Sequence, residues 1–157
     1  MSSEEVPAAL LSMVKMLAEA PEGQRKTMLE SRLREFAAMA DKQRVEAMTQ
    51  MIKAVATLPA DKRITLAKSR IECLCDKFDE ATRKRLAATH MMALMNVPEA
   101  ARKADLEATF ESLKHLSDKH RNTFASTMKA IMAELPPQQR EMMMSQLPPE
   151  ARAMLGT

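Results

Sequence analysis

Residues 41–63 read DKQRVEAMTQMIKAVATLPADKR, and this stretch decides the fold. Arg44 and Arg63 lie 19 residues apart in it, and apolar residues recur between them at every third or fourth position. That spacing is one stripe of an amphipathic helix about four turns long. Pro59 follows the stripe, and proline is favoured in a first helical turn because its missing N–H costs nothing there. The stretch therefore predicts a complete helix, a short turn and the beginning of a second helix.

The interval between the two arginines continues in both directions. Seven arginines, which we call the ruler arginines, are spaced 19 or 20 residues apart: Arg25, Arg44, Arg63, Arg83, Arg102, Arg121 and Arg140. A regular period of this kind is the signature of a repeat architecture. A helical side chain leans toward the N-terminus, so an arginine in the first turn reaches the unpaired carbonyls of the preceding helix. We therefore predict a structural role, in which each ruler arginine joins its helix to the turn before it.

The residues at which helices begin alternate between two kinds. Prolines occur at Pro21, Pro59, Pro98 and Pro136, and N-capping serines or aspartates occur at Ser3, Asp41, Asp79 and Ser117. The repeat is therefore a pair of helices of about 38 residues. Four pairs are predicted near 3–39, 41–78, 79–116 and 117–147, with a short cap at 148–157, in one domain spanning 1–157. The first helices are expected near 4–19, 42–57, 80–96 and 118–134, and the second near 21–38, 59–76, 98–115 and 136–146.

Composition favours an all-α fold. Of the 157 residues, 46% are hydrophobic, and the chain has four phenylalanines, no tryptophan or tyrosine and two glycines. Strong helix formers dominate, whereas the β-branched and aromatic residues that favour strands are scarce. Predicted turns of about four or five residues favour antiparallel neighbours. We expect an array of repeated helical hairpins of the α-solenoid kind, with a closed helical bundle as the alternative.

The end of the chain contains the same turn motif twice. Leu135-Pro-Pro-Gln-Gln-Arg140 is followed by Leu147-Pro-Pro-Glu-Ala-Arg152. Residues 135–152 resemble the Leu-Pro-x-x-x-Arg turns of short helical superhelices, which occur in cytosolic domains of magnesium transporters and in flagellar switch proteins. The tandem pairs also resemble the broad class of α-solenoids, although the tryptophan and Gly-Tyr markers of the tetratricopeptide motif are absent. The resemblance implies a fold and no function.

The first helix of each pair has fewer charged residues than the second. The segment from Leu86 to Val97 has none, and many of the 16 methionines lie in these first helices. A helix with few charges must be covered on nearly all sides. Methionine fills gaps in cores, and it also forms adaptable surfaces that bind apolar helices. Our leading hypothesis is a module for protein–protein interaction or self-association, including a homodimer. Its expected contacts are Met51, Met91, Met92, Met95, Met128 and Met132.

Two other functions stay open. One is a basic helical array that binds nucleic acid or another polyanion, although the net charge of +3 is too mild to favour it. Its contacts would be Arg83, Lys84, Arg85, Lys119 and Arg121. The other is a carrier of a small apolar ligand, which a sizeable ordered cavity between the first helices of the pairs would favour.

No enzyme is predicted, because the chain lacks the motifs of one. Two glycines are too few for a glycine-rich phosphate loop, and neither a nucleophile elbow nor a zinc-protease motif occurs. Cys73 and Cys75 would point to nearly opposite sides of a helix, so they neither bridge nor share a metal. We expect no cofactor and no metal. No apolar run is long enough to span a membrane and no secretory signal is visible, so a reducing, cytoplasmic location is expected.

Overall fold

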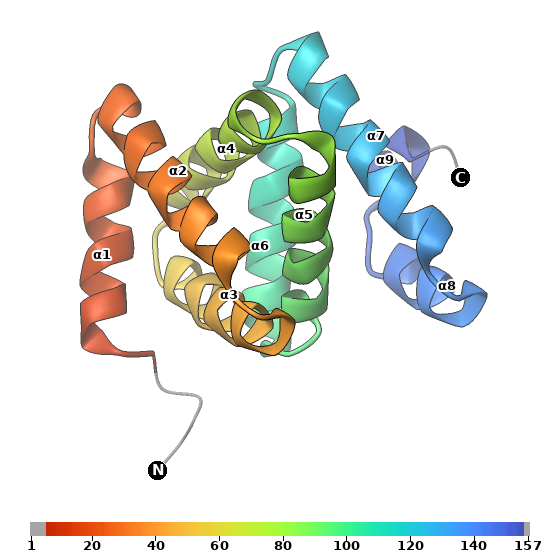
Figure 1. The fold of residues 1–157 in the computed structure, drawn as a ribbon, viewed down its shortest axis with the longest axis horizontal. Helices are drawn as coiled ribbons and strands as arrows, with labels where there is room; N and C mark the ends of the chain where they lie inside the picture. The colour runs from red at the N-terminus through yellow and green to blue at the C-terminus, as the bar shows by residue number, and fades with distance from the viewer. Residues whose placement is uncertain (1–5, 156–157) are drawn as a thin grey trace.

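The computed structural model describes residues 6–155 and shows an all-α helical array, as predicted. Nine helices lie within these residues: α1 (Ala8–Glu19), α2 (Glu22–Ala38), α3 (Asp41–Ala56), α4 (Ala60–Lys77), α5 (Glu80–Leu94), α6 (Glu99–Leu113), α7 (Asp118–Glu134), α8 (Pro137–Ser145) and α9 (Pro149–Met154). The array runs from α1 at one end to α7, α8 and α9 at the other (Figure 1).

Side-chain caps determine where two of the helices begin. Ser117 precedes α7, and its hydroxyl oxygen accepts a hydrogen bond from the backbone N–H of His120. Asp79 precedes α5 in the same way, and its carboxylate accepts a bond from the N–H of Thr82. Each bond satisfies an amide that would otherwise have no partner in the first helical turn. The predicted starts of both helices are therefore correct.

Several helix starts differ from the prediction, and the first of them is α1, which begins at Ala8 after Pro7 and not near residue 4. The helices expected to begin with proline begin one residue later, because Pro21 and its counterparts are extended residues just outside the first turn. Asp41 is the first residue of α3 instead of its cap, and Ala40 occupies the cap position without a side-chain bond. The carboxylate of Asp41 instead pairs with Arg44, three residues later. Ser3, the fourth predicted cap, lies outside the described residues.

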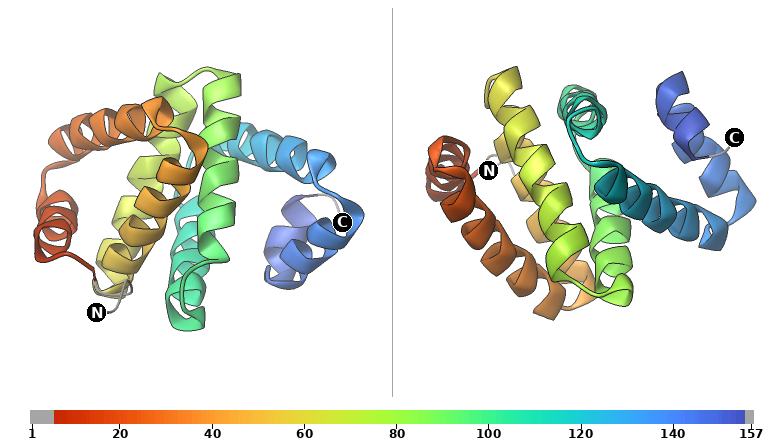
Figure 2. Two further views of the ribbon diagram at one scale, coloured as in Figure 1. Left: turned by 60° about the horizontal axis from the view of Figure 1, so that its bottom comes forward. Right: turned by 90° about the horizontal axis from the view of Figure 1, so that it is seen from above.

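The helices pack in two rows. The odd-numbered helices α1, α3, α5 and α7 lie side by side in one row, and α2, α4 and α6 lie side by side in the other. Figure 2 shows α4 between α2 and α6. The rows interlock because each helix also contacts the third helix along the chain, as α3 contacts α6 and α4 contacts α7. The low-charge helices therefore share a row, which brings the side chains of α5 and α7 together.

Consecutive helices differ from the expected hairpins. They meet at their shared turn but do not pack along their lengths, and the chain changes direction at each turn (Figure 1). The turns have only two to four residues, from 20–21 after α1 to 114–117 after α6. An extended residue such as Pro21, with ψ 150°, directs the next helix away from the preceding one. Such short turns leave too little chain for a side-by-side reversal.

Six of the seven ruler arginines join a helix to the turn before it. In each case a guanidinium N–H donates to the carbonyl oxygen five residues earlier, at 2.5–3.0 Å. These six are Arg25, Arg44, Arg63, Arg83, Arg121 and Arg140. Arg44 is only 4% exposed, and its Nε also donates to Thr89 Oγ1 at 2.9 Å, which links α3 to α5. The bonds satisfy carbonyls that the end of the preceding helix leaves unpaired.

The hydrophobic core lies between the two rows. Val14, Ile71 and Leu86 are its most completely buried large side chains, and they come from α1, α4 and α5. Burial of this kind, and not local helix propensity, supplies most of the stability of short helices. Within residues 6–155, no helix combines the length and the apolar character that crossing a bilayer requires.

A methionine-lined cavity as candidate binding site

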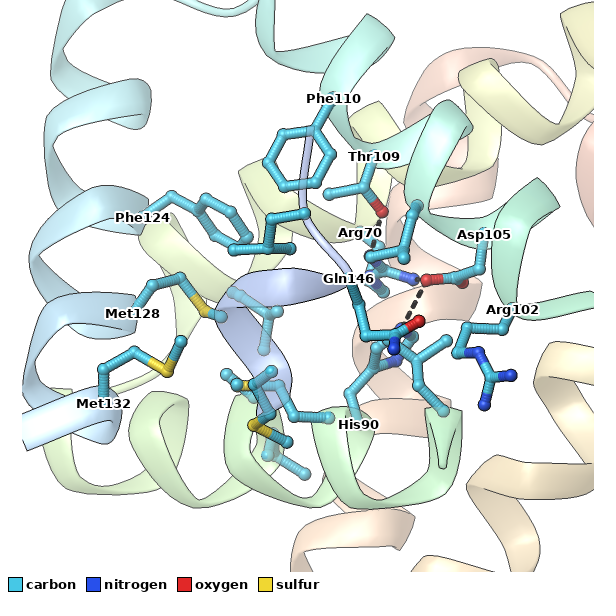
Figure 3. Close-up of a pocket in the computed structure, with 18 of the residues that line it drawn as sticks. Arg70, His90, Arg102, Asp105, Thr109, Phe110, Phe124, Met128, Met132 and Gln146 are labelled. Atoms are coloured by element: carbon cyan, nitrogen blue, oxygen red, sulfur yellow. Dashed lines mark hydrogen bonds and ion pairs between the residues drawn. The ribbon is translucent and has the colours of Figure 1, made fainter. Parts of the chain in front are cut away.

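A cavity of about 100 Å³ lies at the end of the array where α4, α5, α6 and α7 meet the C-terminal helices. Figure 3 shows this site, which we call the methionine cavity. Seven methionines line it: Met48, Met91, Met95, Met128, Met132, Met143 and Met154. Most of the remaining wall is leucine and phenylalanine, including Leu74, Leu106, Phe110 and Phe124. The cavity is therefore an apolar space with a deformable lining.

Helical spacing explains why methionines from two helices reach the same space. Met91 and Met95 are four residues apart at the end of α5, and Met128 and Met132 are four apart on α7. Residues at this spacing share one face of a helix. Because α5 and α7 lie side by side in the odd row, their methionine faces both border the cavity.

The C-terminal helices cover the cavity. Met143 of α8, Met154 of α9 and Leu147 in the turn between them complete the lining. This cover is thinly held, because α8 has no buried residue and neither α8 nor α9 packs closely along another helix. Its main anchors are Ala151 and Leu155, which are buried. A segment with so few buried contacts opens at low cost in free energy.

A cluster of polar side chains lies at one side of the otherwise apolar cavity (Figure 3). His90 Nε2 of α5 lies 3.0 Å from Asp105 Oδ2 of α6. Arg70 Nη1 of α4 lies 3.8 Å from Asp105 Oδ1, and Arg70 Nη2 donates to Thr109 Oγ1 at 3.3 Å. We call Arg70, His90, Asp105 and Thr109 the polar cluster. It links three helices of the two rows.

Asp105 is ionised because its partners outweigh its burial. Its side chain is only 10% exposed. Burial by itself would raise the pKa of this carboxyl, but His90 and Arg70 lower it, and the net pKa lies below the ordinary value. A carboxylate that accepts charge-assisted hydrogen bonds is held in its charged form. The cluster therefore contains one fixed negative charge between Arg70 and His90.

Arg102 is the one ruler arginine that does not join its helix to the preceding turn. Its backbone N–H donates to Pro98 O at 3.0 Å, as in the other helices. Its guanidinium, however, has no hydrogen-bond or ion-pair partner among residues 6–155. The side chain is half-buried and lines the methionine cavity, on the same side as Asp105 and His90 (Figure 3). An unpaired cation therefore borders an apolar cavity.

The polar cluster also borders a second cavity of about 80 Å³, which lies between α1, α2, α3 and α4. Arg70, His90 and Asp105 line both cavities, together with Leu33 and Met48. The cluster is thus a polar partition between two apolar spaces inside the array. Its own bonds hold α4, α5 and α6 in place around both of them.

The methionines expected in a binding face lie in three different places. Met91, Met95, Met128 and Met132 line the methionine cavity, whereas Met51 lines the second cavity. Met92 lines neither cavity, and its side chain is 57% exposed to solvent. Met95 lines the methionine cavity and is also 39% exposed. The sequence pattern therefore identified four cavity residues, but most of the predicted face points inward.

The predicted polyanion contacts have other partners in the structure. Arg83 and Arg121 donate to turn carbonyls, as the ruler arginines do. Lys84 pairs with Glu134, and Arg85 donates to Ala37 O at 3.4 Å. Lys119 is exposed. Four of the five cations are therefore engaged within the fold, which weakens the case for a basic binding track.

The sequence offered little sign of the polar cluster. Arg70, Asp105 and Thr109 follow no motif, and they approach His90 only because α4, α5 and α6 pack together. Among the described residues, no group of three or more His, Cys, Asp or Glu side chains is placed to hold a metal ion. Both thiols are free, and burial raises the pKa of Cys73 and of Cys75 to about 11, so neither is a reactive thiolate at neutral pH.

Comparison with known proteins gives no relative. No family model matches the chain, and neither a curated protein nor a solved structure is similar to it. A function therefore has to be inferred from the geometry of the chain itself.

Proposed function

We propose that this protein is a non-enzymatic carrier that holds a small apolar ligand in the methionine cavity. The observation that carries the proposal is the convergence of Met91, Met95, Met128 and Met132 on one space of about 100 Å³. Small-molecule sites in proteins are concave, mostly apolar and supplied with a few polar groups that orient the ligand. The methionine cavity and its polar cluster have these three properties.

The size of the cavity limits the ligand. Apolar protein cavities of about 150 Å³ take up benzene. The methionine cavity, at about 100 Å³, is smaller than that, so an alkyl chain such as that of octan-1-ol enters only when the lining or the C-terminal cover moves outward. Methionine is unbranched and has a polarizable sulfur, so the lining can adjust around a somewhat longer chain. The thinly held α8 and α9 offer a route of entry that leaves the two rows intact.

The carrier is tested by titrating octan-1-ol into the full chain labelled with ¹³C at the methionine methyl groups. We expect the methyl resonances of Met91, Met128 and Met132 to shift in proportion to bound ligand. Met16 and Met92 are 55% and 57% exposed outside the cavity, so their resonances should not move. They are controls within the same spectrum.

Two results would contradict the carrier. One is a titration in which no methionine resonance shifts. The other is a uniform small shift of all sixteen methionines, which would indicate weak coating of the surface and not uptake into the cavity.

A second candidate function is self-association through the exposed side of α5. Met92 is 57% and Met95 39% exposed, and they lie in the stretch from Leu86 to Val97 that has no charged residue. Exposed apolar side chains that gather in a low-charge segment are typical of protein interfaces. This candidate keeps the methionine-rich protein-binding face, reduced to the two methionines that reach the surface.

Light scattering coupled to size exclusion tests this candidate. We expect a homodimer that Met92→Glu dissociates, because a charge at the centre of an apolar interface would be buried without a partner. Met16→Glu is the matched control, since Met16 is 55% exposed on α1, far along the array from α5. A wild-type monomer at high concentration would exclude self-association and leave the carrier unaffected.

A further inference from the structure

We propose that the ligand of the methionine cavity is an amphipathic monoanion whose acidic head group pairs with Arg102 while its apolar chain lies among the methionines. The ligand class is a small carboxylate with an alkyl or aryl tail. This inference rests on the carrier function, and it adds the chemistry that selects the ligand.

Arg102 differs from its counterparts in what its guanidinium contacts. The six other ruler arginines donate to a carbonyl five residues earlier, and in all six cases the helix begins two residues after that carbonyl. Arg102 occupies the equivalent place in the first turn of α6 but makes no such bond within residues 6–155. The four-residue turn 95–98 precedes it. Its five guanidinium donors are therefore available to a ligand in the cavity that it lines.

The charges around the cavity require one more anion. Arg70 and Arg102 supply two positive charges, and Asp105 supplies one negative charge that Arg70 and His90 already contact. One positive charge is thus left over beside an apolar wall even when His90 is neutral. A cation partly removed from water is costly unless it is paired. A single carboxylate would balance the site, whereas a second negative charge would face Asp105.

The geometry of a carboxylate matches that of Arg102. A guanidinium presents parallel N–H donors that bind both oxygens of a carboxylate at once, which a point charge such as ammonium does not. Gln146 lines the same cavity, and its side-chain amide points toward the polar cluster from the C-terminal cover (Figure 3). It offers an N–H donor on the opposite side of the head group. The methionines then enclose the tail.

Calorimetric titration of the full chain with octanoate and with octan-1-ol tests the inference, at pH 7 and constant ionic strength. The two probes share one alkyl chain and differ in the head group. We expect wild type to bind octanoate about tenfold more tightly than octan-1-ol, because a charge-assisted pair is added to the same apolar contact. Arg102→Gln should lose this preference and still bind octan-1-ol as wild type does.

Lys103→Gln is the matched control. It removes the same charge from the neighbouring residue of α6, but Lys103 is exposed and does not line the cavity. We expect its octanoate affinity to equal that of wild type. A parallel loss in Lys103→Gln and Arg102→Gln would reveal attraction to net charge and overturn the role of Arg102.

The remaining outcomes separate the inference from the carrier function. Equal affinity of wild type for octanoate and octan-1-ol, or undiminished octanoate binding by Arg102→Gln, would overturn the head-group site while the carrier stands. Failure of both probes to bind would overturn the carrier as well. Circular dichroism of Arg102→Gln verifies its fold, which we expect to be intact because the guanidinium has no partner among the described residues.

Discussion

His90 Nε2 lies 3.0 Å from Asp105 Oδ2, and this contact joins α5 to α6 beside the methionine cavity. Arg70 approaches the other oxygen of the same carboxylate from α4. One carboxylate thus links three helices, α4, α5 and α6. Two of them, α5 and α6, are consecutive but do not pack along their lengths, so the carboxylate supplies a connection that their short turn does not.

We predict that Asp105→Asn destabilises the protein by about 3 kcal/mol, since it leaves the partly buried Arg70, whose side chain is 22% exposed, without its counter-charge. The measurement is urea unfolding followed by circular dichroism. Glu107→Gln is the matched control, because Glu107 is exposed on the same helix and its replacement should cost less than about 0.5 kcal/mol. Equal stability of wild type and Asp105→Asn would show that the cluster does not hold the three helices together.

The stabilisation by Asp105 should depend on pH with a definite sign. Burial opposes ionisation, but His90 and Arg70 hold the pKa of Asp105 in the folded protein below its ordinary value of 3.8. The carboxylate therefore stabilises the folded state above pH 3.8, and this contribution is lost as the pH falls below 3.8 toward the folded pKa. We expect the stability difference between wild type and Asp105→Asn to be fully present at pH 5, about one unit above that value, and to shrink as the pH falls below 3.8.

The same substitution should destabilise the protein at one ruler arginine and leave its stability nearly unchanged at another. Arg44→Gln removes bonds to Met39 O and Thr89 Oγ1 from a side chain that is 4% exposed, so we expect a loss of about 2–4 kcal/mol. Arg102→Gln removes no bond to the described residues, so we expect a change within about 0.5 kcal/mol. Thermal unfolding of the two variants side by side measures the contrast. Equal losses would mean that Arg102 has a structural role after all.

The thiols should be slow to react in the folded protein. Burial raises the pKa of Cys73 and of Cys75 to about 11 from the ordinary 9.0. The reactive thiolate is therefore about 100-fold scarcer at neutral pH than in the unfolded chain. At pH 7.5, about 1.5 units below the ordinary thiol pKa of 9.0, we expect iodoacetamide to label the native protein at least about 100-fold more slowly than the protein in urea. Mass spectrometry of timed samples measures both rates.

Amide hydrogen exchange should distinguish the C-terminal cover from the rows. α8 has no buried residue, whereas α4 has six. We expect the amides of α8 to exchange by local opening and those of α4 only when the whole domain unfolds. Saturation with octan-1-ol should slow exchange in α8 and α9 if they close over the ligand. Equal protection of α8 and α4 in the free protein would show that the cover is a fixed part of the core.

The helices could be located from sequence because their signals are local. Pro21, Ser117 and the apolar stripe after Arg44 act within a few residues of their own position. The hairpin arrangement could not be obtained in the same way. Turns as short as 78–79, between α4 and α5, direct each helix away from the preceding one. Which helices then pack against each other depends on how their side chains fill the space between them.

The candidate site was predicted only in part. Met91 and Met128 were recognised by helical spacing, but sequence could not show whether they face solvent, a partner or one another. Met92, one residue along, points outward and is 57% exposed. Successive helical residues differ by about 100° in direction, so the position of the neighbouring helix decides which of the two is enclosed.

The sequence by itself determined that this chain is an array of helices and where nearly all of them begin and end, because caps, prolines and apolar periodicity act locally. The tertiary structure alone decided that α5 and α7 border one cavity, that Asp105 meets His90 and Arg70, and that Arg102 lines this cavity with no partner among residues 6–155. Seven arginines are equivalent in sequence, and only the contacts around each one make six of them structural and leave the seventh unpaired within the described part of the chain. The carbonyls that bind the six lie only five residues earlier in the chain, so the difference depends on how each turn and the side chains around it pack.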